Sequence, residues 1–244
     1  MAKLRIQKLL GPSGVASRRA VEEMVLQGRI TVNGEMVTKL PCFVEPTDEI
    51  LVDGQPVRKR VEPKVYYLLN KPRGVICTQR DEPGRSRPRA ADVLGPTGER
   101  VYCVGRLDAD STGIILLTND GELTNRLTHA RYGVGKTYIA RVDGRLSGEE
   151  IDSLKRGIYM AGRRTAPAAV TILRRTEQET LLELRISEGR NRQVRRMLAA
   201  LGHNVRRLHR QAIGPVTDRG LKIGQHRRLT PGELAALRRA TGKR

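Results

Sequence analysis

Residues 105–121, GRLDADSTGIILLTNDG, place a short polar loop directly before an apolar run. Gly105 and Gly113 bracket the loop, and Ile114–Thr118 has the composition of a buried strand. Loops held between rigid strands commonly carry functional side chains. This stretch therefore predicts a polar site at the end of a sheet strand.

Asp108 is the first candidate in that loop for a chemical role. It follows Leu107 directly, so we expect its carboxylate at the loop mouth, beside apolar surface. A carboxylate placed there can act as a nucleophile or a base. Spacing alone favours an aspartate that merely caps a turn, and Asp110 is a rival two positions on.

The segments on either side predict an α+β fold. Ser147 and Glu150 form a capping box for a helix through Lys155, and Thr230–Glu233 caps a last helix. Strands outnumber helices without regular alternation, so we expect a mixed or antiparallel sheet. Residues 80–90, with four Arg and two Pro, predict an exposed loop. The predicted strands are residues 65–69, 101–104, 114–118, 137–142 and 180–186.

A helix after Asn191 is predicted to have two opposed faces. At 100° per residue, Arg192, Arg195 and Arg196 fall within about 100° of arc. Arg195 borders the apolar face and is best placed to reach inward, and Gly202 ends the helix. The apolar face carries Val194, Met197, Leu198 and Leu201.

The first 62 residues predict a separate small module. Ser17 caps a helix whose buried side is Val21, Met24 and Val25. Residues 29–37 predict a hairpin turning at Asn33-Gly34. A strand over 49–52 follows, and 58–64 is a polar linker. We expect exposed Arg18, Arg19 and Arg29, and a first helix that ends early at Gly11-Pro12-Ser13.

The charge indicates a polyanionic partner. The chain carries 46 Lys and Arg against 26 Asp and Glu, a net charge of +20, and residues 183–244 hold 16 basic and 4 acidic residues. Such an excess opposes compact folding unless a polyanion is bound, although a solvated arginine-rich surface is the simpler alternative. Aromatic residues make up only 3%, without Trp. Shape and phosphate recognition of folded RNA therefore fits better than base stacking.

Other classes of site and location are disfavoured. The three cysteines and four histidines show no metal-ligand spacing, so we expect no metal. No apolar run approaches the roughly 20 residues of a membrane span, and the N-terminus lacks a secretory signal. We expect a cytoplasmic protein that does not bind a membrane.

The N-terminal module resembles the S4 RNA-binding domain. Gly14–Arg19 and Gly28–Gly34 carry the resemblance, over about 50 residues. It implies that Arg18, Arg19 and Arg29 contact RNA. We expect domain boundaries at 1–62 for this module and 63–244 for a catalytic domain.

The remainder resembles the RsuA/RluB branch of pseudouridine synthases, in which an S4 module precedes the catalytic domain. Besides residues 105–121, four motifs occur in the family's order: 136–138, 188–197, 208–210 and 213–215. The resemblance implies a mixed, mostly antiparallel sheet and a reaction without cofactor.

The resemblance also implies roles for individual residues. Asp108 takes the place of the catalytic aspartate, which attacks the ribose anomeric carbon or helps remove a neighbouring ribose proton. Tyr138 takes that of the tyrosine packed against the flipped uracil, and Arg195 that of the arginine paired with the aspartate. An Asp108–Arg195 ion pair would hold the carboxylate ionised and oriented. Further expected substrate contacts are Arg106, which helps to position the target, Leu208 beneath the uracil, and Arg192 and Arg196 at phosphates.

The implied function is isomerisation of uridine to pseudouridine in ribosomal RNA by a monomer. Residues 133–135 and the complete 188–197 motif favour large-subunit (23S) rRNA, although Ala130 departs from the family pattern. Small-subunit (16S) rRNA is the alternative substrate. A non-catalytic RNA-binding or ribosome-assembly factor is a rival from another class, and a hydrolase using Asp108 with Asp110 is a third.

Overall fold

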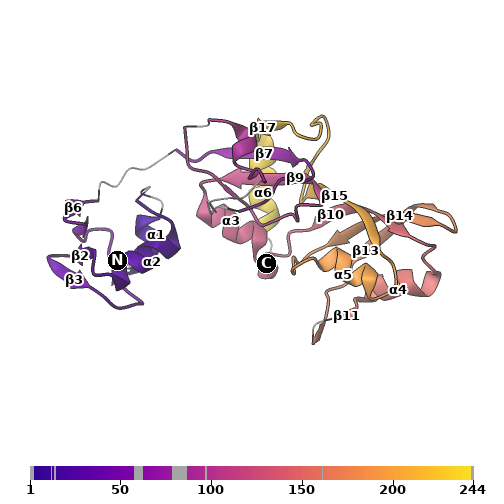
Figure 1. Cartoon of the computed structure of the whole chain (residues 1–244), viewed down its shortest axis with the longest axis horizontal. Coiled ribbons are helices and arrows are strands. Elements are labelled where there is room, and N and C mark those ends of the chain that lie inside the picture. The colour runs from indigo at the N-terminus through magenta and orange to yellow at the C-terminus, as the bar shows by residue number, and fades with distance from the viewer. Residues whose placement is uncertain are drawn as a thin grey trace. The chain divides into compact units, whose positions relative to one another are not determined.

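The computed structural model describes residues 3–11, 13, 15–57, 63–78, 87–96, 98–160 and 162–242. It divides into two compact units, residues 1–64 and 65–244 (Figure 1). Most of the predicted 80–90 loop, residues 80–86, lies outside the described residues. Within the described chain, none of the helices combines the length and apolar character needed to cross a bilayer.

The described residues of the first unit form two helices and six short strands. Strands β2, β3, β5 and β6 form a sheet in the order β3-β2-β5-β6, and β1 pairs with β4. Its core consists of Ile6, Leu10, Val21, Val25, Ile30, Val44 and Ile50. The elements are β1 (Leu4–Arg5), α1 (Ile6–Leu10), α2 (Arg18–Leu26), β2 (Ile30–Val32), β3 (Glu35–Val37), β4 (Phe43–Val44), β5 (Ile50–Val52) and β6 (Gln55–Pro56).

The predicted helix cap, hairpin turn and early end of the first helix are confirmed, whereas most of the predicted linker, residues 58–62, lies outside the described residues. The Ser17 hydroxyl accepts a hydrogen bond from the Ala20 amide at the start of α2. Asn33 and Gly34 both have positive φ, 52° and 83°, as a two-residue hairpin turn requires. Helix α1 ends at Leu10, just before the predicted break.

The second unit is built on a nine-stranded mixed sheet, in agreement with the predicted α+β fold. Its main strand order is β13-β14-β10-β15-β9-β7-β17, with β16 beside β15 and β8 beside β9. Among these pairs, β9 with β15 is parallel and all the others are antiparallel. The strands of this sheet are β7 (Tyr66–Lys71), β8 (Tyr102–Cys103), β9 (Thr112–Thr118), β10 (Lys136–Asp143), β13 (Ala169–Arg175), β14 (Glu179–Ile186), β15 (Val205–Ile213), β16 (Val216–Thr217) and β17 (His226–Arg228).

Helices lie at both ends of this sheet (Figure 1), and the two pairs pack on opposite faces of it. Ile115 and Leu117 of β9 belong to a large core that also takes in residues of α4 and α5. Ile114 and Leu116, which alternate with them, belong to a small core under α3 and α6. The helices are α3 (Gly121–Thr128), α4 (Gly148–Arg156), α5 (Gln193–Ala199) and α6 (Pro231–Gly242), with 3-10 turns η1 (Asp92–Leu94) and η2 (Ala130–Tyr132) and a small hairpin of β11 (Tyr159–Met160) and β12 (Arg163–Arg164).

Both predicted capping boxes are present. Ser147 and Glu150 exchange hydrogen bonds at the start of α4, and Thr230 and Glu233 do so at the start of α6. Helix α3 was not predicted, although its cap is local, since the Asp120 carboxylate accepts from the Glu122 and Leu123 amides. Strands β13, β15 and β17 were also not predicted.

The parallel pair β9–β15 requires glycine at its start. Gly113 lies opposite Arg210 and has a φ of 113°. A Cβ atom at this position would lie 2.3 Å from the Arg210 carbonyl oxygen. The two strands can approach this closely only because position 113 has no side chain.

Candidate active site

The predicted catalytic loop joins β8 to β9 at the centre of the sheet. Leu107 is buried in the large core, whereas the Asp108 side chain keeps 30% of its surface exposed. The Gly74 amide donates to the Ala109 carbonyl at 2.7 Å, and the Ser111 amide donates to the Asp108 carbonyl at 3.1 Å. These bonds and the buried leucine fix the loop, so Asp108 stands at its mouth on apolar packing.

Arg192 lies against this loop but is not part of the helix, so the prediction that it lies on the helical arc is wrong. It has a left-handed backbone, with a φ of 48°, and precedes the first helical residue, Gln193. Its Nη1 lies 3.2 Å from Oδ2 of Asp108 and 3.8 Å from Oδ1 of Asp110. In this structure the half-exposed Arg192 therefore meets the carboxylates of the loop.

Buried contacts explain the unusual backbone before α5. The Gln193 side chain is 3% exposed, donates to Glu188 at 2.5 Å and accepts from the Arg190 amide at 3.0 Å. Glu188 also forms an ion pair with Arg190 at 3.2 Å. These bonds close the chain into a tight loop that turns Arg192 toward Asp108. The 188–197 motif contains all three residues, but its spacing did not reveal this role.

Arg195 projects from the first turn of α5 into the same cluster, with only 12% of its side chain exposed. Nη1 donates to the Val205 carbonyl at 2.9 Å, and Nη2 donates to the Ser111 hydroxyl at 3.3 Å. Its nearest recorded carboxylate is Asp110, 3.0 Å from Nη2, whereas Asp108 lies 4.0 Å from Nε. The expected contact with Asp108 thus exists only at the outer limit of an ion pair.

The rest of α5 agrees with the predicted faces. Val194, Met197 and Leu198 are buried in the large core, and Arg196 is exposed. Arg106, on the catalytic loop, is exposed as well. Both side chains are therefore open to solvent and available to a ligand.

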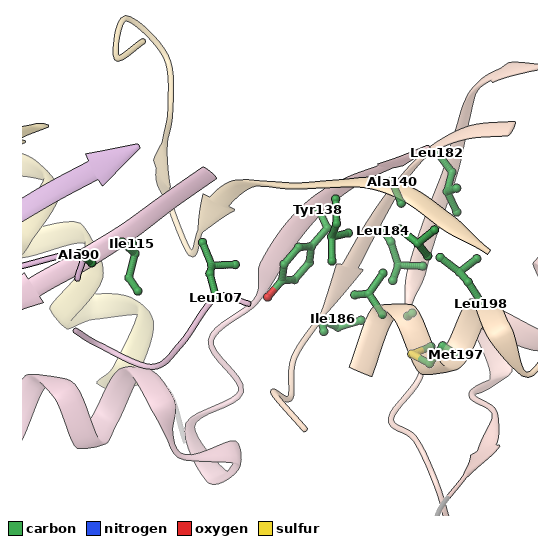
Figure 2. Packing of buried hydrophobic residues seen from close by; sticks show 14 of the residues in the cluster. Ala90, Leu107, Ile115, Tyr138, Ala140, Leu182, Leu184, Ile186, Met197 and Leu198 are labelled. Atoms are coloured by element: carbon green, nitrogen blue, oxygen red, sulfur yellow. The ribbon is translucent and has the colours of Figure 1, made fainter. Parts of the chain in front are cut away.

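Tyr138 and Leu208 belong to the large core beside the loop. Tyr138 is 9% exposed on β10, and Leu208 is 7% exposed on the neighbouring strand β15. Figure 2 shows the Tyr138 hydroxyl pointing toward Leu107, the residue that precedes Asp108. The structure thus brings Asp108, Tyr138, Arg192, Arg195 and Leu208 to one region of the sheet.

Three basic groups, the buried Lys71 and Arg210 and the partly buried Lys136, were not among the predicted site residues. Lys71 is fully buried and donates to the Pro72 and Val75 carbonyls at 2.9 and 2.8 Å, and burial lowers the pKa of its ammonium. Arg210 is 3% exposed and donates through Nε to the Ile114 carbonyl at 2.8 Å. Burial and the charge of Arg210 lower the pKa of Lys136 to about 8. Each lies in or beside a motif of the sequence, but their burial depends on strand pairing.

The cysteines Cys77 and Cys103 also lie beside the loop. The Leu107 amide donates to the Cys77 sulfur at 3.5 Å. A hydrogen bond from Cys103 and the nearby charges of Lys71 and Arg210 lower the pKa of Cys77 below its usual value. A cationic environment of this kind stabilises anions, which is the electrostatic character expected where negative charge develops.

The arginines expected to contact RNA lie on the surface of the first unit. Arg18 and Arg19 are exposed at the start of α2. Arg29 is exposed too, but its guanidinium binds both carboxylate oxygens of Asp53, at 2.8 and 2.5 Å. The positive charge of Arg29 is therefore partly balanced within the unit.

Two of the histidines, His203 and His209, bind side chains and carbonyls of the protein. His209 lies between the Thr112 hydroxyl, at 2.9 Å, and Asp218, at 2.7 Å. His203 contacts the Asp143 carbonyl at 2.7 Å and Glu150 at 3.3 Å. Across the described residues, no three His, Cys, Asp or Glu side chains gather in a group suited to a metal ion.

Chemically, the cluster offers two partly exposed carboxylates, Asp108 and Asp110, each with two guanidiniums within 4.0 Å. The arginines place positive charge beside Asp108, and Tyr138 supplies a buried ring and a hydroxyl directed to the loop. Such a carboxylate can attack an electrophilic carbon or accept a proton.

Comparison with known proteins gives matches over nearly the whole chain. A family model described as RNA pseudouridylate synthase matches residues 65–200, and an S4 domain model matches residues 4–50. Ribosomal large subunit pseudouridine synthase B of Bacillus subtilis (strain 168) is 45% identical over 236 residues, covering 96% of this chain and 95% of that protein. Ribosomal small subunit pseudouridine synthase A of Yersinia pestis is 33% identical over 238 residues, covering 96% and 98%. A crystal structure of a pseudouridylate synthase superposes with a TM-score of 0.70 at 32% identity, covering 96% of this chain and 99% of that one.

Proposed function

Because the chain belongs to the RNA pseudouridylate synthase family and carries an S4 domain, we propose that it converts specific uridines of large-subunit ribosomal RNA to pseudouridine. The observation that carries the proposal is the placement of Asp108. Its carboxylate is held at the mouth of a rigid loop, within 4.0 Å of Arg192 and Arg195. The same region of the large core contains Tyr138.

In this reaction the bond between uracil N1 and ribose C1′ breaks, and a bond between uracil C5 and C1′ forms. The proton on C5 leaves and N1 gains one, so atoms and charge balance without a redox step. Asp108 either attacks C1′ or helps remove a neighbouring ribose proton. Arg195 orients the carboxylate, Tyr138 packs on the uracil and handles a proton, and Leu208 lies beneath the base.

The uridine must leave its stack to reach Asp108, which costs a few kcal/mol that RNA contacts offset. Arg106, Arg192 and Arg196 lie at the surface beside the site and supply contacts to the target and its phosphates. We assign RNA binding to residues 1–62, through Arg18, Arg19 and Arg29, and catalysis to residues 63–244. The protein acts as a cytoplasmic monomer without a cofactor.

Large-subunit rRNA is supported by the Bacillus relative, at 45% identity, over the small-subunit enzyme of Yersinia, at 33%. The two relatives differ in their identity to the chain but not in how much of it they match, because both cover 96% of it. Small-subunit rRNA is therefore the alternative substrate, and mapping of pseudouridines in both rRNAs from a deletion strain distinguishes the two.

The activity is tested by tritium release from rRNA labelled at uridine C5 and prepared from the deletion strain. We expect release by the wild type, and release slowed by about 10³-fold or more in Asp108→Asn, because the carboxylate is required for chemistry. Asp152→Asn is the matched control, since Asp152 is an exposed carboxylate on α4. If the wild type releases no tritium from either rRNA, free or in ribosomal particles, the proposal that the protein is an enzyme is contradicted. That result would support a non-catalytic binding or assembly factor.

A further inference from the structure

The far end of the Arg195 guanidinium is fixed by three neighbours. Nη1 donates to the Val205 carbonyl, and Nη2 donates to the Ser111 hydroxyl. The same Nη2 lies 3.0 Å from Oδ2 of Asp110. Because a guanidinium is planar and its N–H groups point in fixed directions, these contacts set the position of the whole group.

The remaining N–H group of Arg195 is in an unusual state. Nε is buried and has no hydrogen-bond partner. It lies 4.0 Å from Oδ2 of Asp108, about 1 Å beyond hydrogen-bonding distance. Buried donors without a partner are rare in proteins and require an explanation. A donor that is held in place without a partner beside a reactive carboxylate is preorganised for that carboxylate.

Arg192 does not provide the same rigidity, although it is the closer cation to Asp108. Its side chain is 46% exposed and stands before the helix, whereas Arg195 is 12% exposed and anchored at both ends of its Nη fork. Exposed ion pairs contribute little and exchange readily with solvent or other anions. A fixed donor for Asp108 must therefore come from Arg195.

We propose that Asp110 is a positioning residue, which holds Arg195 so that its Nε–H is directed at Asp108 during the reaction. Of the three groups that fix Arg195, Asp110 is the one that carries a negative charge. The attraction between opposite charges 3.0 Å apart is stronger than that between a guanidinium and a neutral hydroxyl or carbonyl. Its side chain is 39% exposed, so replacing it is expected to leave the fold intact. This role rests on the proposed function, because it acts through Asp108.

The first test compares Asp110→Asn with wild type in the tritium-release assay. Asparagine keeps the shape but removes the charge that holds Arg195. We expect kcat to fall about 10- to 100-fold, the loss that follows a small misplacement of a catalytic group, with KM changed less than about threefold. The control Asp152→Asn is expected to keep the wild-type kcat. An Asp110→Asn enzyme with wild-type kcat overturns the inference and leaves the proposed function standing.

A double-mutant cycle separates positioning from a general structural effect. Arg195→Lys removes the Nε–H and the fork that Asp110 holds. If Asp110 acts through Arg195, adding Asp110→Asn to Arg195→Lys changes kcat less than about twofold, although each single change is costly. Losses that multiply in the double variant overturn the inference.

A third readout does not need turnover. The Nε–H of Arg195 is buried in the wild type, so its proton is expected to exchange slowly in a ¹⁵N-labelled sample. In Asp110→Asn we expect this exchange to accelerate at least about tenfold, while amide exchange in α5 stays unchanged. Unchanged Nε–H exchange overturns the positioning role even if the wild type proves inactive on every rRNA tested.

Discussion

Lys136, on the strand that also carries Tyr138, has a lowered pKa. It begins β10, its ammonium donates to the Val134 carbonyl at 3.1 Å, and its pKa falls to about 8 through burial and the nearby Arg210 charge. An unfolded lysine keeps its proton to about pH 10.4. Below about pH 8 the charged Lys136 ammonium therefore lowers the free energy of unfolding of the folded chain.

The consequence is a pH dependence of stability in the alkaline range. Between about pH 8 and 10.4 the unfolded state binds more protons than the folded state, so the free energy of unfolding contributed by Lys136 rises with pH. Lys136→Met lacks this contribution. Urea unfolding followed by circular dichroism at several pH values should show wild type gaining stability relative to Lys136→Met as pH rises. A constant difference between the two proteins contradicts the assignment.

At the scale of single residues, the sequence predicted the placements that depend on neighbouring residues in the chain. Asp108 follows a buried leucine and stands at a loop mouth, as its position in the run indicated. The inward reach of Arg195 followed from helical periodicity. The left-handed backbone of Arg192 did not, because it depends on buried bonds between Gln193, Glu188 and Arg190.

The junction of β9 and β15 is where an element depends most on one residue. An alanine at position 113 would bring its Cβ to 2.3 Å from the Arg210 carbonyl at a φ of 113°. We expect Gly113→Ala to lower the free energy of unfolding by about 2–3 kcal/mol through strain. Gly148→Ala is the matched control, since a Cβ there meets nothing within 4 Å at the first turn of α4.

Thermal unfolding of the two glycine variants measures this difference. Gly148→Ala is expected to match or slightly exceed wild type, because alanine favours a helix. Gly113→Ala should also lose activity, since the strained strand follows the catalytic loop. A Gly113→Ala protein as stable as wild type would mean that β9 and β15 can separate without cost.

The elements marked by sequence signals a few residues apart were predicted, whereas strands defined by pairing with distant segments were not. The capping boxes of α4 and α6 and the Asn33-Gly34 hairpin rest on residues a few positions apart. Strand β15 pairs in parallel with β9, about 100 residues earlier, and β17 pairs with β7, about 160 residues earlier. In β15 the basic and apolar residues do not alternate simply, because the basic Arg210 is buried.

For the whole molecule, the net charge of +20 implies that RNA affinity depends strongly on salt. We expect the double change Arg18→Ala with Arg19→Ala to weaken rRNA binding and to reduce the slope of log affinity against log salt by roughly 1–2. Arg29→Ala should change the slope less, because Asp53 already binds Arg29.

Filter binding over a range of salt concentrations measures these slopes. Turnover at saturating RNA should be unchanged in the Arg18 and Arg19 variant, because both residues lie in the 1–64 unit and Asp108 lies in the 65–244 unit. Equal slopes for wild type and the double variant would exclude these arginines from phosphate contact.

The strand pairing at the edge of the sheet has a consequence for how such chains are assembled. Strand β17 lies along β7, and the Leu229 amide donates to the Tyr66 carbonyl at 2.9 Å. The first and last strands of the 65–244 unit are thus immediate neighbours. A chain that ended before β17 would therefore leave β7 at the edge of the sheet, with its backbone N–H and C=O groups unpaired on that side.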